Sequence, residues 1–83
     1  MHYKIKDDVD LSVLEEYGYE FFEYAGGVKS YAKETSDVVV CVLFDREIVW
    51  YILPYRMCYL EEQNKHYIKD LIDAGLVEEA NND

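Results

Sequence analysis

The sequence predicts one α+β domain, with a short N-terminal helix, a four-stranded antiparallel β-meander and a longer C-terminal helix packed on the sheet. Aromatic-rich and valine-rich runs between residues 19 and 53 are typical of strands. Short connections between these runs favour antiparallel pairing of consecutive strands. After residue 60 the apolar residues recur with the period of a helix. A chain of 83 residues has room for a single domain, 1–83, and we expect a loose tail over about 79–83.

The first helix is predicted over 11–17, in the stretch LSVLEEY. Asp10 is a favoured N-cap residue, and Gly18 supplies the left-handed conformation that ends many helices. Leu11 and Leu14 share one face, so we expect this short helix to dock on the rest of the domain.

Four strands follow. Gly26-Gly27 predicts a two-residue turn between strands at about 19–25 and 28–34, the second of them nearer a sheet edge. The stretch VVVCVLFDREIVWYIL, 38–53, predicts the third and fourth strands, joined at Asp45-Arg46-Glu47. Pro54 is expected to end the last one, because it lacks a backbone donor.

Alternation along the third and fourth strands leaves neither face polar. One face carries Val39, Cys41, Val49 and Tyr51, and the other carries Val40, Val42, Ile48 and Trp50. Leaving such side chains exposed forfeits roughly 1.5 to 3 kcal/mol each. Either the two helices divide between the faces, or the bare face meets a target or a second copy, and we favour self-association.

The longest helix is predicted over about 60–74. Gly75 ends it, and LVEEA continues as a short extended segment. Its apolar stripe consists of Leu60, Tyr67, Ile68, Leu71 and Ile72.

The charge is strongly acidic: 18 Asp and Glu against 8 Lys and Arg give a net charge of −10. This field opposes direct binding to nucleic acid and would steer the protein toward a partner with a basic surface. The longest apolar run, 38–44, is far shorter than a membrane span, and the N-terminus lacks the apolar core of a signal peptide. We therefore expect a cytoplasmic protein with reduced cysteines that binds no membrane.

The sequence indicates no catalytic residue, metal site or cofactor. His66 lies between Glu62 and Asp70 at helical spacing, but no nucleophile accompanies it. Cys41 is expected in the core, and Cys58 is expected to be more accessible. An enzyme or small ligand-binding domain that uses His66 stays an alternative.

The predicted partner-binding residues combine an aromatic and basic loop with acids from both ends of the chain. Tyr and Arg are enriched at the centres of interfaces. If the acids lie together, their carboxylates could imitate spaced phosphates in a nucleic-acid-binding cleft. The residues are Tyr55, Arg56, Tyr59, Glu15, Glu16, Glu20, Glu23, Glu61 and Glu62.

Two stretches, LEEYGYEF at 14–21 and IKDLIDAGLVEEA at 68–80, resemble many small uncharacterised proteins of bacteriophages and mobile elements. The resemblance implies a non-enzymatic accessory protein or an inhibitor of a host system such as a nuclease-based defence, that is, an anti-CRISPR-like protein. The leading hypothesis is a small acidic protein-binding module that inhibits a host nucleic-acid-binding or defence protein. A structural homodimer that associates through the sheet, with no other partner, is the second hypothesis.

Overall fold

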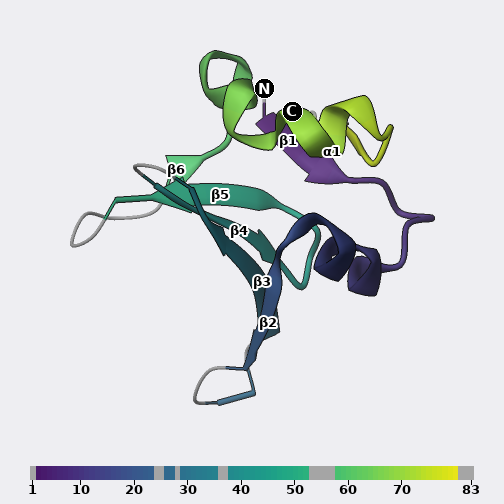
Figure 1. Ribbon diagram of the computed structural model, residues 1–83, viewed down its shortest axis with the longest axis vertical. Coiled ribbons are helices and arrows are strands. Elements are labelled where there is room, and N and C mark those ends of the chain that lie inside the picture. Colours follow the sequence, from purple (N-terminus) through teal and green to yellow (C-terminus); the bar gives the residue numbers. More distant parts are fainter. Residues whose placement is uncertain (1, 24–25, 28, 36–37, 53–57, 81–83) are drawn as a thin grey trace.

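The computed structural model describes residues 2–23, 26–27, 29–35, 38–52 and 58–80. Two antiparallel sheets are present in this part of the chain (Figure 1), one of five strands in the order β2-β3-β4-β5-β6 and one of two strands, β1-β7. Their bounds are β1 His2–Ile5, β2 Glu20–Glu23, β3 Lys29–Glu34, β4 Val39–Leu43, β5 Ile48–Tyr51, β6 Cys58–Tyr59 and β7 Val77–Ala80. The helical segments are η1 Leu11–Tyr17, η2 Glu62–Ile68 and α1 Lys69–Asp73.

The predicted antiparallel meander is confirmed in β2 to β5, but the strand number was wrong. The meander has a fifth strand, β6, which is only two residues long and therefore carries no periodic signal. The β1–β7 pair joins segments from the two ends of the chain, His2 opposite Ala80 and Ile5 opposite Val77. Local patterns do not reveal such a long-range pairing.

The first helical segment lies where it was predicted, and its caps are those expected. The Asp10 carboxylate accepts a hydrogen bond from the Ser12 backbone N–H at 3.0 Å, and Gly18 has φ 90°. The segment is a 3₁₀ helix, with Val13 N–H donating to the Asp10 carbonyl at 3.0 Å. Leu14 of this segment lies in the core, where it is fully buried.

The predicted two-residue turn at Gly26-Gly27 was wrong in length. Both glycines have positive φ, 86° and 79°. However, Glu23 pairs with Lys29, so the odd number of residues in 24–28 separates the paired strands, whereas a two-residue turn requires an even number. The edge prediction also fails, because β3 lies between β2 and β4 and the edge strand is β2.

The C-terminal helical region has the predicted position and a different form. Residues of η2 are wound as a 3₁₀ helix, and only the five residues of α1 are α-helical. Leu60 is fully buried but precedes the helix. Gly75 has φ 74° and donates its N–H to the Ile72 carbonyl at 3.0 Å, so it serves as the predicted stop.

Both helical regions and the β1–β7 pair lie on the same side of the five-stranded sheet (Figure 1). The alternative in which the helices divide between the two faces is therefore wrong. We call this side the covered face. Its core consists of Ile5, Leu14, Tyr19, Val38, Val40, Val42, Ile48, Leu60, Ile68 and Leu71.

Strand β1 closes the core rather than forming a loose terminus. Tyr3 N–H donates to the Leu60 carbonyl at 3.0 Å, and Ile5 N–H donates to the Arg46 carbonyl at 2.9 Å. His2, the first residue of this strand, has an exposed fraction of 4%. Glu79 and Ala80, expected in the tail, are the last two residues of β7.

Candidate functional site

The second face of the five-stranded sheet, which we call the open face, is the candidate functional site. Strand registers align Glu20, Ala32, Cys41, Val49 and Tyr59 in one row across it. The predicted division of apolar residues between faces is confirmed, since the residues of each set pair only with one another in β4 and β5. The open face also carries Phe22, Ser30, Glu34, Val39, Leu43 and Tyr51.

The centre of the open face is buried by its own strands. Ala32, Cys41 and Val49 form a separate apolar cluster, against which Val39, Leu43 and Tyr51 pack. In the described part of the chain, every residue of this cluster comes from β3, β4 or β5. The sheet therefore shelters its small central residues without help from the helices.

Cys41 is the predicted core thiol, with an exposed fraction of 1%. Burial raises the pKa of this thiol, and a hydrogen bond with Tyr51 acts in the opposite direction. A raised pKa lowers the thiolate fraction near neutral pH, as is typical of a cysteine buried in a core. Cys58 is exposed, as expected.

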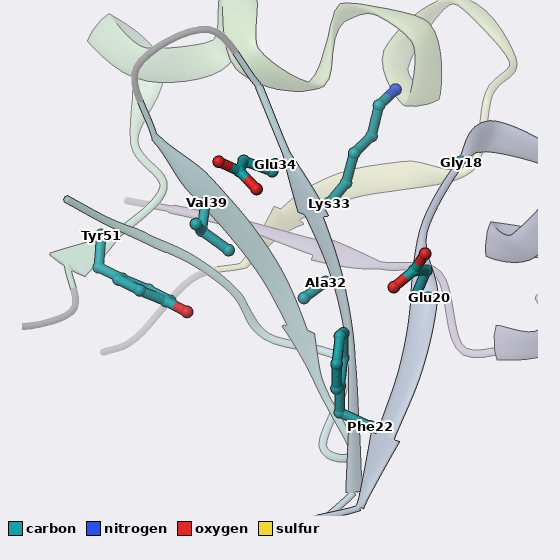
Figure 2. A pocket seen from close by; sticks show the side chains of 8 residues that line it. All are labelled: Gly18, Glu20, Phe22, Ala32, Lys33, Glu34, Val39 and Tyr51. Atoms are coloured by element: carbon teal, nitrogen blue, oxygen red, sulfur yellow. The ribbon is translucent and has the colours of Figure 1, made fainter. Parts of the chain in front are cut away.

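A cavity of about 610 Å³ lies on the open face (Figure 2). Its apolar wall comes from three neighbouring strands and an edge aromatic side chain. Carboxylates stand beside this wall, one on β2 and one on β3. The lining residues are Gly18, Glu20, Phe22, Ala32, Lys33, Glu34, Val39 and Tyr51.

The cavity presents negative charge, although Lys33 is one of its lining residues. Lys33 extends away from the cavity in Figure 2, and its Nζ lies 3.0 Å from the Asp70 carboxylate of α1. Within the described residues, neither Glu20 nor Glu34 forms a hydrogen bond or ion pair through its side chain. No cation among the described residues therefore pairs with either carboxylate.

The structure describes all of the predicted partner-binding residues except two. Tyr55 and Arg56 lie outside the described residues, as does Pro54. Tyr59 is 52% exposed, and its ring stacks on His2 with centroids 4.6 Å apart. All six predicted glutamates, Glu15, Glu16, Glu20, Glu23, Glu61 and Glu62, are exposed.

The acids from the two ends of the chain lie at opposite edges of the five-stranded sheet. Glu20 and Glu23 are on edge strand β2, whereas Glu61 and Glu62 directly follow the other edge strand, β6. Glu62 is also engaged, because Lys65 donates to it at 2.6 Å and the Tyr3 hydroxyl at 2.5 Å. Both bonds, that from Lys65 more strongly, hold the pKa of Glu62 below its usual value.

A second cavity, of about 480 Å³, lies beside His66. The His66 ring contacts Tyr67, with centroids 4.2 Å apart. Two lysines line the cavity, and each is already ion-paired at 2.6 Å, Lys65 with Glu62 and Lys69 with Asp73. The alternative function at His66 stays a prediction. Among the residues described, no cluster of three His, Cys, Asp or Glu side chains could hold a metal ion.

Sequence reasoning missed Glu34, Ala32 and Phe22 as members of the site. The available signal was the alternation along each strand, which puts Glu20 on the same face as Phe22. Without the register between strands, that signal does not show that β2 and β4 contribute to one cavity.

No family model, curated protein or solved structure matches this chain. Across the residues that the structure describes, no helix has both the length and the apolar character needed to cross a membrane.

Proposed function

We propose that this protein is a non-enzymatic, acidic protein-binding module that presents the open face of its sheet to a basic partner protein. The observation that carries the proposal is the asymmetry of the sheet. All described helices and the β1–β7 pair lie on one face, while the other has an acidic cavity with an apolar wall.

The charge of the whole chain supports such a partner. A net charge of −10 accelerates encounter with a cationic surface at low salt. Once the proteins meet, the apolar wall of the cavity supplies contact area that is insensitive to salt. The net charge therefore guides the encounter with the partner, and the apolar wall stabilises the complex once it has formed.

A second copy is a poorer occupant of the open face than a basic partner. It would bring another net charge of −10 and the same two carboxylates of the cavity. Like charges that meet across an interface oppose association. The homodimer is therefore the second candidate, supported by the uncovered face alone.

The resemblance to bacteriophage and mobile-element proteins extends the proposal to inhibition. Proteins that bind nucleic acid have basic clefts, and an acidic module can occupy such a cleft in competition with phosphates. In this form of the proposal, the target is a host nucleic-acid-binding or defence protein.

The test is affinity capture from a bacterial lysate with three immobilised proteins: wild type, Val39→Lys and Gln63→Lys. Val39 lines the cavity, whereas Gln63 is an exposed residue of η2, so the two variants make the same change of charge at different places. We expect a basic protein that wild type and Gln63→Lys retain and Val39→Lys loses. Equal retention by the two variants, or no captured protein, contradicts the proposal, provided that circular dichroism shows both variants folded.

A further inference from the structure

The geometry points to the ligand of the open-face cavity: we propose that it receives an extended partner segment with an Arg or Lys and, two residues further on, an apolar side chain. This inference rests on the proposed function and names the chemistry of the partner at that same site. The cationic side chain lies between Glu20 and Glu34, and the apolar side chain lies against Val39 and Tyr51.

The register makes Glu20 and Glu34 diagonal neighbours on one face of the sheet. Glu20 lies directly opposite Ala32, and Glu34 is two residues further along β3 on the same face. Diagonal neighbours of this kind are about 7 to 8 Å apart at their Cα atoms. A guanidinium has five N–H donors, so it can bond to both carboxylates from a position between them.

The apolar subsite follows from the next two strands. Val39 is opposite Glu34, and Tyr51 is opposite Val39, so the row runs from a carboxylate to two apolar side chains. Adjacent strands are about 4.8 Å apart, whereas alternate side chains of an extended peptide are about 6.6 Å apart. Two residues of a segment that crosses the strands therefore reach from Glu34 to just beyond Val39, on the side of Tyr51.

No cation of the chain itself fulfils this role in the described residues. Lys33 is the nearest by sequence, but it is ion-paired with Asp70 and lies 5.5 Å from the centroid of the Tyr19 ring on the covered face. Figure 2 shows its side chain directed away from the cavity, unlike the carboxylate of Glu20. The cavity thus has two carboxylates that a ligand can neutralise.

Five of the seven cationic side chains that the structure describes are already engaged within the chain, whereas Lys6 and Lys29 form no ion pair, so a second copy is a poorer source of this ligand. Arg46 Nη1 donates to the carbonyls of Lys6 and Val9, at 2.8 and 2.6 Å. Four lysines are held in ion pairs within the chain, namely Lys4, Lys33, Lys65 and Lys69. A different protein is the better donor.

The experiment is a titration of the ¹⁵N-labelled full chain with the peptide acetyl-Gly-Ser-Arg-Ser-Leu-Ser-Gly-amide, followed by amide chemical shifts. We expect saturable shifts centred on Ala32, Glu34 and Val39. The double variant Glu20→Gln, Glu34→Gln should raise the Kd at least tenfold. The control Glu78→Gln, Glu79→Gln makes the same change of charge on β7 and should leave the Kd within twofold. Replacing the peptide Arg by Glu should abolish the shifts, and replacing Leu by Ser should weaken binding.

Shifts that do not saturate, that map to β7 or η1, or that persist in the Glu20, Glu34 double variant would overturn the inference. Concentration-dependent shifts at the same amides without peptide would identify a second copy as the occupant and would also overturn it. The spectra of each variant report whether it is folded. If the peptide fails while capture still depends on Val39, the proposed function stands and only the ligand assignment is wrong. If capture is independent of Val39, the proposed function is wrong whatever the peptide does.

Discussion

Val39 and Val40 are adjacent residues of one type, yet they occupy the two different faces of the sheet. Val40 is fully buried beneath the helical regions and β1, whereas Val39 is half-buried at the cavity of the open face. The open face is not simply bare, because Ala32, Cys41 and Val49 are sheltered by their strand neighbours. A small domain can therefore protect the centre of a second face and still leave a margin that can bind a partner.

The largest expected effect comes from truncating the two valines separately, which tests whether the covered face contributes more to stability than the open face. Val40→Ala removes buried methyl groups and leaves a cavity, so it should lower the free energy of unfolding by about 2 to 3 kcal/mol. Val39→Ala should cost less than about 1 kcal/mol, because its side chain is already in part exposed. Urea denaturation measures both. Equal losses would mean that the open face supports the fold as much as the covered one.

On the covered side, the Tyr3 hydroxyl donates a hydrogen bond to the Glu62 carboxylate, and this bond should affect the titration of Tyr3. The pKa of Tyr3 is raised to about 12, mainly because its hydroxyl donates to Glu62 and further through burial. Since the folded-state pKa exceeds the ordinary value of 10.0, this stabilisation is complete below about pH 10 and is lost as the pH rises through about 12.

We therefore expect the free energy of unfolding of the wild type to fall between pH 10 and pH 12, and that of Tyr3→Phe to fall less. Tyrosine ¹³Cζ shifts can follow Tyr3 directly, and Glu62→Gln should bring its titration back toward pH 10. An unchanged titration in Glu62→Gln would show that the hydrogen bond does not close this side in solution.

The reactivities of the two cysteines can be used to compare the centre of the open face, where Cys41 lies, with the edge strand β6, which carries Cys58. Cys41 is buried with a raised pKa, whereas Cys58 on β6 is exposed. Iodoacetamide at pH 8 should modify Cys58 at least tenfold faster than Cys41, with peptide mass spectrometry as the readout. In urea the difference should disappear. Comparable rates in the folded protein would mean that the sheet does not shelter its own centre.

The smallest effect concerns Lys33, whose ion pair with Asp70 links β3 to α1 at 3.0 Å. Both side chains are about one-third exposed, so solvent weakens the pair. Lys33→Met should lower the free energy of unfolding by less than about 1 kcal/mol. Urea denaturation measures the loss, with Asp70→Asn as the control. A larger loss in Lys33→Met alone would indicate that packing of the aliphatic part of Lys33 contributes more to stability than the ion pair does.

Much of the local structure could be predicted from particular residues. Asp10 and Gly18 bound η1, and Gly75 follows the C-terminal helical region. Alternation in β4 and β5 assigned each apolar residue to its correct face. These features depend on backbone geometry within a few residues, so the sequence carries them directly.

The candidate site could be predicted only in fragments. Glu20 was named as a binding residue, but its neighbours Ala32 and Glu34 were not. Tyr3 and Glu62 are far apart in sequence. The pairing of β1 with β7 and the hydrogen bond from the Tyr3 N–H to the Leu60 carbonyl bring the N-terminal strand beside the C-terminal helical region. Such contacts depend on strand register and chain closure, which local periodicity does not encode.

By itself, the sequence determined the acidic charge, the approximate positions of most elements and the two sets of side chains that share a face. Tertiary structure alone decided that η1, η2 and α1 gather on one of those faces and that Glu20 and Glu34 line one cavity beside an apolar wall. The physical reason is that alternation is a property of each strand, whereas covering a face is a competition among distant segments for the same apolar surface.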